Sequence, residues 1–333
     1  MSQQPTTRPR IVYLATGGTI ASVRGQGAAG ATPTLTAAQI AADVPGLAEA
    51  ADLEARQLVQ KPSVDLGFAD VTAVLAAARE AVDGGAAGVV VSQGTDTIEE
   101  TAYALDLCWD RTEPLVVTGA MRNPSLAGGD GPANLLAAVQ TAAATTSRDR
   151  GVLVVLNEEI HAARLVQKRH TFAASAFASP AGGPLGRLAE GEPRYLGRLP
   201  QLPVVAYAGE PVPPVALVTV ALDDDLRLLP ALADLGYRGC VLAGAGGGHV
   251  PARTVAAVRD LVTRMPVVLT SRIGAGEVLT RTYAYAGSEQ ELIAAGALPA
   301  GGLHPLKARV LLATLLATGA DPDRVAAELR LRG

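Results

Sequence analysis

Three apolar runs in the first half of the sequence end in small polar residues that could do chemistry. The three segments are LATGGTIAS (residues 14–22), VSQGTDT (91–97) and VTGAMRNPSLAGGDG (117–131). The first places Thr19 after two glycines, and the second places Thr95 beside Asp96. A threonine hydroxyl attacks a carbonyl when a neighbouring base takes its proton and amide donors stabilise the oxyanion. Nucleophilic catalysis by Thr19 or Thr95 is therefore one hypothesis for this chain.

A lysine near a carboxylate could supply the base if enough of it is neutral. Lys168, in ARLVQKRHT, is the candidate, because lysines are scarce here and this one follows the apolar run 152–157. A solvated surface lysine is the competing interpretation.

Helix capping is the structural alternative for the second motif. Thr97 with Glu100, or Asp96 with Glu99, fits the capping-box spacing. A phosphate-binding turn is a weak alternative for the first motif, because the G-x-G-x-x-G spacing is absent.

The elements that must position these residues alternate between strand-like and helix-like patterns. Strands are predicted at residues 11–15, 54–59, 88–92, 115–118 and 152–157, and helices at 70–83, 98–109 and 133–146. This alternation predicts βαβ crossovers and a doubly wound, mostly parallel sheet covered on both faces. Ligands bind such sheets at the carboxyl ends of the strands, where the polar motifs lie.

A smaller α/β pattern fills the second half. We predict strands at 215–221, 239–243 and 267–270, and helices near 228–235, 252–264, 305–318 and 322–330, the last capped by Asp321. Residues 180–214, rich in Pro and Gly, are predicted to form a hairpin and linker. The expected division is a larger domain over 1–190, a linker over 191–213 and a smaller α/β domain over 214–333.

Composition restricts the partners. A formal net charge of -4, with no Lys/Arg cluster, argues against nucleic acid and acidic membranes as partners. Cys108 and Cys240 are expected to be buried reduced thiols, and the four histidines show no metal-ligand spacing. The start MSQQPTTRPR has no apolar signal region and no run is long enough to span a membrane. A cytoplasmic protein without a metal is the expectation.

The motifs together resemble the bacterial L-asparaginases and glutaminase-asparaginases. The resemblance rests on LATGGTIA, QGTDTIEETAYALDL, VTGAMR with GGDGPANL, GVLVVLNEEIHAARLVQK and HPLKARVLL, and runs from about residue 10 to the end. It implies hydrolysis of a side-chain amide, most simply L-asparagine to L-aspartate and ammonia. It also implies a threonine acyl-enzyme and no cofactor.

The resemblance also assigns residues. Thr19 matches the first-motif nucleophile, and a triad is formed by Thr95, Asp96 and Lys168. Substrate contacts are expected at Gly18, Ser63, Gly94 and Ala120. His249 matches a position that reaches a neighbouring subunit's site in a homotetramer, a dimer of dimers, so at least a homodimer is expected.

The departures from the family concern substrate recognition. Gln93 replaces a histidine and Val64 replaces a polar residue, and the loop over 23–37 lacks the family's tyrosine. Possible substitutes for that tyrosine are Thr32, Thr34, Tyr283 and Tyr285, and the second-domain acid could be Glu277 or Glu289. Three alternatives to an asparaginase therefore stay open. The chain could be a hydrolase of the same fold that acts on glutamine, another amide or a lactam, or it could transfer the amide group. It could also be a non-catalytic, ligand-binding relative.

Overall fold

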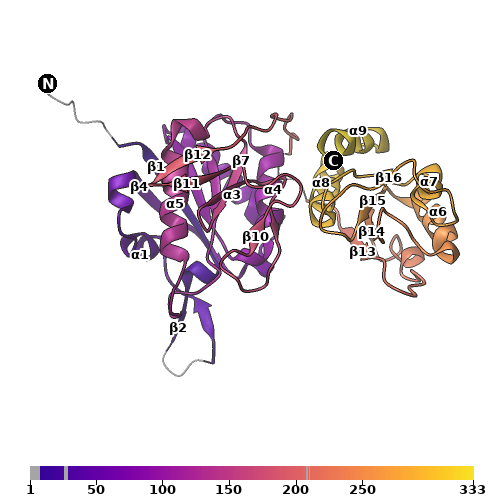
Figure 1. Ribbon diagram of the computed structural model, residues 1–333, viewed down its shortest axis with the longest axis horizontal. Helices are drawn as coiled ribbons and strands as arrows, with labels where there is room; N and C mark the ends of the chain where they lie inside the picture. Colours follow the sequence, from indigo (N-terminus) through magenta and orange to yellow (C-terminus); the bar gives the residue numbers. More distant parts are fainter. Residues whose placement is uncertain (1–7, 26–28, 208, 210) are drawn as a thin grey trace. The chain divides into compact units, whose positions relative to one another are not determined.

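The chain forms two compact units, residues Met1–Val204 and Val205–Gly333 (Figure 1). The computed structural model describes residues 8–25, 29–207, 209 and 211–333. The division falls inside the segment 191–213 predicted as a linker, and the strand β12 (Glu192–Tyr195) within that segment belongs to the sheet of the first unit.

The first unit is built on one eight-stranded sheet. Its strands, in spatial order, are β12, β11 (Gly186–Ala189), β8 (Glu159–Ala162), β7 (Val152–Leu156), β6 (Leu115–Thr118), β5 (Gly88–Ser92), β1 (Arg10–Gly17) and β4 (Asp52–Lys61). The five strands from β7 to β4 run parallel, whereas β8, β11 and β12 pair antiparallel. The sheet is therefore mostly parallel, as predicted.

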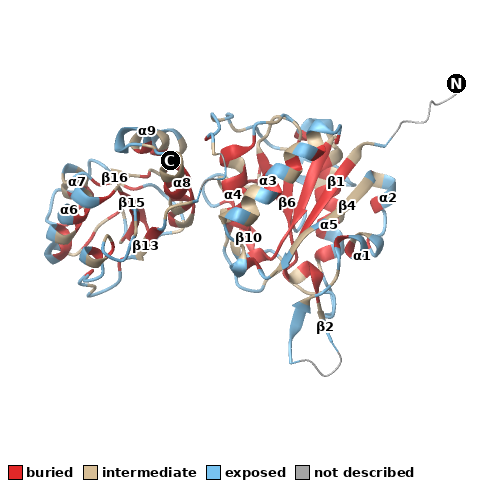
Figure 2. Ribbon diagram, turned by 180° about the vertical axis from the view of Figure 1, so that it is seen from behind, coloured by how far each residue is buried: buried red, intermediate tan, exposed pale blue. Residues whose placement is uncertain are grey.

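Helices cover both faces of this sheet, and its central strands, such as β1 and β6, are the buried red arrows in Figure 2. The helices are α1 (Ala37–Ala42), α2 (Leu47–Ala50), α3 (Phe68–Asp83), α4 (Ile98–Cys108) and α5 (Gly131–Ala143). Helix α5 packs on β5, β6 and β7, and α2 packs against α5. Helices α3 and α4 pack against each other, and they also contact β5 and β7, respectively. This double cover explains the continuous apolar runs, because both sides of each central strand are buried.

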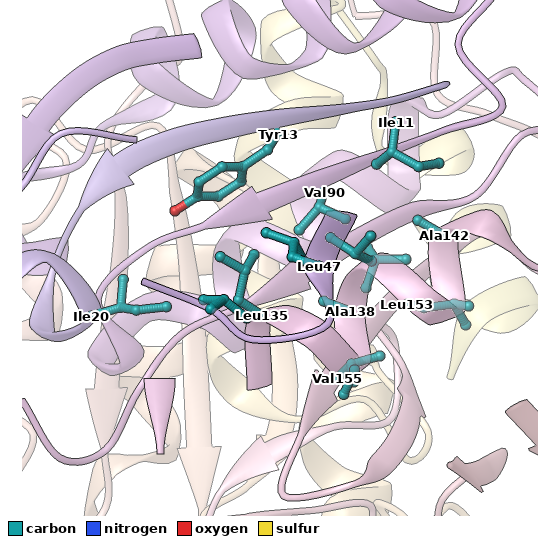
Figure 3. Packing of buried hydrophobic residues seen from close by; sticks show 14 of the residues in the cluster. Ile11, Tyr13, Ile20, Leu47, Val90, Leu135, Ala138, Ala142, Leu153 and Val155 are labelled. Carbon is teal, nitrogen blue, oxygen red and sulfur yellow. The ribbon is translucent and has the colours of Figure 1, made fainter. Parts of the chain in front are cut away.

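One face of the sheet forms the core shown in Figure 3. Ile11, Tyr13 and Val90 alternate along their strands with residues that point to the other face. Leu135 and Ala138 of α5 pack against them, and all five residues are fully buried. Small alanines at the helix surface let α5 lie close to the sheet, which suits a chain with only 3% aromatic residues.

The predicted strands and helices of residues 11–157 are confirmed, with ends that differ by at most three residues. Two hairpins outside the main sheet were not predicted: β2 (Ser22–Arg24) with β3 (Ala31–Pro33), and β9 (Gln167–Lys168) with β10 (Phe177–Ala178). Their strands are two or three residues long, too short to produce a periodic pattern.

The second unit is a smaller parallel sheet. Its strands are β13 (Val215–Thr219), β14 (Gly239–Gly244), β15 (Val267–Ser271) and β16 (Leu298–Pro299), and its helices are α6 (Val255–Arg264), α7 (Glu289–Ala294), α8 (Pro305–Ala317) and α9 (Pro322–Arg332). Asp321 caps α9 as predicted, because its Oδ1 accepts from Arg324 N at 2.8 Å. The helix predicted near 228–235 is wrong, since only a 3-10 turn, η5 (Leu229–Ala231), forms around Pro230.

Both cysteines are free and buried, as predicted. Over the described ranges, every helix is too short or too polar to cross a bilayer.

Candidate active site

The carboxyl ends of β1 and β5 meet with unusually close backbone packing. Gly18 has φ +82°, and a Cβ added there would lie 2.0 Å from Gly94 N. A Cβ on Gly94 would in turn lie 2.8 Å from Ser63 Oγ. Only glycine permits these two approaches, so three distant segments of the chain converge at one edge of the sheet. These three residues are among the predicted substrate contacts.

Thr95, Asp96 and Lys168 form a hydrogen-bonded group at this edge. Lys168 Nζ donates to Thr95 Oγ1 at 2.9 Å and to Asp96 Oδ1 at 2.6 Å. Thr95 is 5% exposed, whereas the Asp96 side chain is 62% exposed and the Lys168 side chain 14%. The lysine thus joins a buried hydroxyl to a carboxylate that faces solvent. A lysine so placed can exchange a proton with the hydroxyl.

Ser63 ties the turn of Thr95 and Asp96 to a neighbouring segment. It begins the 3-10 turn η2 (Ser63–Asp65) and is 3% exposed. Its Oγ accepts from Asp96 N at 3.2 Å, and its carbonyl accepts from Thr97 Oγ1 at 3.0 Å. The neighbouring Val64 is 67% exposed, so an apolar side chain stands beside this polar group.

The predicted capping box of α4 is wrong. Thr97 occupies the N-cap position, but its side chain makes no capping hydrogen bond. The Thr97 hydroxyl donates to Ser63 instead, so a tertiary contact has replaced the local cap.

The loop after β6 is organised by Asp130. Its carboxylate accepts from Met121 N at 3.0 Å and from Arg122 N at 2.8 Å. Ala120, a predicted substrate contact, precedes this pair and is fully buried. The role of Asp130 is therefore to shape the backbone of the loop.

Gln93 is fully buried behind the Thr95 turn. Its Nε2 lies 3.3 Å from Thr101 Oγ1 and 3.4 Å from Gly94 O, both long for hydrogen bonds. Its Oε1 has no hydrogen-bond partner among the residues that the structure describes. The side chain that departs from the family pattern is thus loosely bonded.

Thr19 follows Gly18 directly and begins the 3-10 turn η1 (Thr19–Ala21). It is partly exposed. The approach of Gly18 to Gly94 places the Thr19 turn beside the segment that carries Thr95.

The loop of residues 23–37 forms the β2–β3 hairpin, and its residues 26–28 lie outside the described part of the chain. Thr32 and Thr34, the possible substitutes for the missing tyrosine, are both exposed. Thr34 N donates to Ala21 O at 2.9 Å, which joins the base of the hairpin to the Thr19 turn.

The second unit carries a separate polar and aromatic cluster. Tyr285 OH and His249 Nδ1 are 2.8 Å apart, and His249 Nε2 is 3.1 Å from Glu289 Oε2. The ring of Tyr283 packs edge-on against His249 at a centroid distance of 5.2 Å. Of the two predicted acids, Glu289 joins this cluster, whereas Glu277 is exposed outside it.

Glu289 is held as an anion at the base of this cluster. Burial raises its pKa, but the amides of Tyr283 and Thr282, with His249 nearby, lower it more, so the net pKa lies below its ordinary value. Both tyrosines remain exposed, 43% for Tyr283 and 51% for Tyr285.

Sequence reasoning missed one partner of the lysine. Glu99 Oε1 accepts from Lys168 N at 3.3 Å, and Glu99 is 5% exposed. In the sequence Glu99 fits the pattern of a capping residue, and no local signal connects it with Lys168, which is distant in the chain. Within the described ranges, no group of three or more His, Cys, Asp or Glu side chains is placed so that it could hold a metal ion.

Comparison with known proteins covers both units. Residues 10–201 match the family model "Asparaginase, N-terminal", and residues 214–328 match "Glutaminase/Asparaginase C-terminal domain". The chain is 37% identical to a "Probable L-asparaginase" of Deinococcus radiodurans, covering 96% of this chain and 97% of the relative. It is 36% identical to a "Probable L-asparaginase periplasmic" of Haemophilus influenzae, over 94% and 90%. Among solved structures, a probable cytoplasmic L-asparaginase from Campylobacter jejuni has a TM-score of 0.86 at 30% identity, covering 97% and 99%.

Proposed function

We propose that this chain, which belongs to the asparaginase family of amidohydrolases, hydrolyses L-asparagine to L-aspartate and ammonia. The observation that carries the proposal is the bridge from Lys168 Nζ to both Thr95 Oγ1 and Asp96 Oδ1. A lysine between a buried hydroxyl and a carboxylate can move a proton to and from that hydroxyl during the reaction.

The reaction has two steps. A threonine hydroxyl attacks the side-chain carbonyl carbon, the C–N bond breaks, and the hydroxyl proton leaves with the nitrogen as ammonia. Water then attacks the resulting ester, which releases the carboxylic acid and restores the hydroxyl. Thr19 and Thr95 are the two candidate nucleophiles, and Lys168 accepts and returns the proton for Thr95.

Polar groups at the sheet edge bind the substrate. Asp96, with its half-exposed carboxylate, takes the α-amino group. Ser63 Oγ accepts from Asp96 N, so its own proton is available to a substrate carboxylate. Backbone groups of Gly18, Gly94 and Ala120 line the same edge.

The exposed side chain of Val64 favours a second candidate substrate, glutamine or another amide. An apolar residue beside Ser63 offers no hydrogen bond to the α-groups of asparagine, and it tolerates a longer or less polar substrate.

Ammonia release tests both candidates. L-asparagine, D-asparagine and L-glutamine are compared with the wild-type protein and with Thr19→Ala and Thr95→Ala. Turnover of L-asparagine that falls in both variants supports the proposal. Inactivity toward all three amides removes the asparagine assignment, and full activity in both variants removes the threonine mechanism.

We also propose assembly as a homotetramer, a dimer of dimers, in the cytoplasm. The cluster of His249 with the exposed Tyr283 and Tyr285 is then a contact to a neighbouring subunit. Light scattering after size exclusion should give four chains per particle, and a monomer would reject the assembly. Cell fractionation separates a cytoplasmic location from the periplasmic one named for the Haemophilus relative.

A further inference from the structure

The lysine of the site lies on a hairpin outside the eight-stranded sheet. β9 pairs antiparallel with β10, with Lys168 opposite Phe177. Arg169 N extends the pairing by donating to Ala176 O at 2.6 Å. In the described part of the chain no strand ladder joins this hairpin to the main sheet. Other contacts must therefore hold Lys168 Nζ at the Thr95 hydroxyl.

The loop of the hairpin is closed by its own residues. His170 Nδ1 accepts from Phe172 N at 3.0 Å and from Ala173 N at 2.9 Å. These bonds order the loop, but they give it no attachment to the sheet. The polar contacts that attach it lie at the two ends of the hairpin.

The first end is attached to helix α4. Glu99, in the first turn of α4, accepts the Lys168 backbone N–H with Oε1 at 3.3 Å. Asp96, three residues earlier, accepts from Lys168 Nζ at 2.6 Å. One short stretch of chain therefore holds both the backbone and the side-chain end of the lysine. Glu99 is 5% exposed, so water does not readily replace it.

The second end is attached to the main sheet. Ser179, directly after β10, has its Oγ 2.9 Å from His161 Nδ1, and the two residues are 4% and 0% exposed. His161 lies on β8, and its Nε2 is 3.4 Å from Glu159 Oε2. Glu159 in turn pairs with Arg187 of β11 at 2.8 Å. The Ser179–His161 contact thus ties the end of the hairpin to β8.

We propose that Glu99 and the Ser179–His161 pair are positioning residues that hold the Lys168 hairpin at two buried points. Neither point needs to contact the substrate. They keep the distance between Lys168 Nζ and the Thr95 hydroxyl, on which proton transfer depends. This inference rests on the proposed function for its catalytic part, while the anchoring itself can be measured without any substrate.

The test uses the full chain, two matched pairs of variants and three measured quantities. Glu99→Ala removes the acceptor, whereas Glu99→Gln keeps an oxygen that can accept from Lys168 N. Ser179→Ala removes one buried hydroxyl, whereas Ser175→Ala removes an exposed one from the same hairpin. Each protein is assayed for kcat and KM with L-asparagine, and hydrogen exchange is measured over residues 165–179.

Glu99→Ala and Ser179→Ala should lower kcat about 10- to 100-fold, the size expected for misplacing a catalytic group by about 1 Å. KM should change by less than about 3-fold, because the anchors do not touch substrate. Hairpin exchange should quicken about 10-fold or more in these variants. Glu99→Gln and Ser175→Ala should stay within about 3-fold of wild type in all three quantities.

Unchanged kcat or unchanged hairpin exchange in both Glu99→Ala and Ser179→Ala overturns the inference. If Glu99→Ala does not fold, Ser179→Ala, the smaller deletion, decides. If the wild-type protein releases no ammonia from L-asparagine, the proposed function fails. The exchange comparison then still shows whether the two anchors hold the hairpin.

Discussion

Replacing Gly18 by alanine tests the close packing on which the site is built. Gly18 has φ +82° and ψ -167°, a conformation that is essentially restricted to glycine. Adopting it costs an alanine about 1–3 kcal/mol. The new Cβ would also lie 2.0 Å from Gly94 N and 2.3 Å from Gly94 Cα, and these backbone atoms cannot turn away as a side chain would.

The overlap adds a second cost of about 1–3 kcal/mol, which is typical of forcing extra atoms into a packed site. The two costs together lower the free energy of unfolding of the first unit by about 2–6 kcal/mol. For a unit of this size, that loss corresponds to a melting temperature lower by roughly 5–20 °C. Activity should also fall at temperatures where the protein is still folded, because the Thr19 turn is pushed away from Gly94.

Circular dichroism during heating measures the shift, with Gly197→Ala as the control. Gly197 has no atom within 4 Å of the added Cβ and no strained φ. Its replacement should change stability by less than about 0.5 kcal/mol. Equal melting temperatures for Gly18→Ala and Gly197→Ala would refute the argument that the strand ends are brought together through these glycines.

Four further outcomes are expected. Ser63→Ala should raise KM for L-asparagine about 5-fold, the equivalent of about one hydrogen bond, and an unchanged KM would exclude Ser63 as a substrate contact. Val64→Gln should lower that KM by about 3- to 10-fold if the valine weakens asparagine binding, and steady-state kinetics show whether it does. Burial raises the pKa of the Cys240 thiol to about 12. Since its folded pKa lies above its unfolded value, Cys240 stabilises the fold below about pH 9, and that stability is lost as the pH rises toward about 12. Cys240→Ala should therefore flatten this decline in the free energy of unfolding, measured by urea titration at each pH. An equal decline in wild type and variant would assign the pH dependence to other groups. Cys108 and Cys240 should both resist a thiol reagent until the chain unfolds, and rapid labelling of the native protein would contradict their burial.

The alternation of residues 11–157 was predictable because each central strand is buried on both faces. The runs at 88–92 and 115–118 each hold consecutive apolar residues closed by one small polar residue, and they end at the residues that the structure shows. Their boundaries are sharp because Ser92 and Thr118 close the two apolar runs. The antiparallel strands β8, β11 and β12 were harder, because each has only four residues and partly exposed positions.

Long-range contacts set the limit of prediction at the site. Thr95 and Asp96 lie next to each other in sequence, but Lys168 is more than seventy residues away. Its scarcity made it a candidate base, and the family resemblance assigned it to the same triad. Thr97 shows how a local rule fails. The capping pattern predicts that its hydroxyl bonds to the helix backbone, but the hydroxyl donates to the carbonyl of Ser63 instead. Glu99 is the same kind of case, because its partner is Lys168 N.

The most direct test of the account compares ammonia release from L-asparagine by the wild-type protein and by Lys168→Met. Methionine keeps much of the bulk of the lysine but can neither accept nor donate the proton. We expect turnover by the wild type and, in the variant, a kcat that is at least about 100-fold lower with a similar melting temperature. A wild type that releases no ammonia, or a variant within a few-fold of wild type, would contradict it.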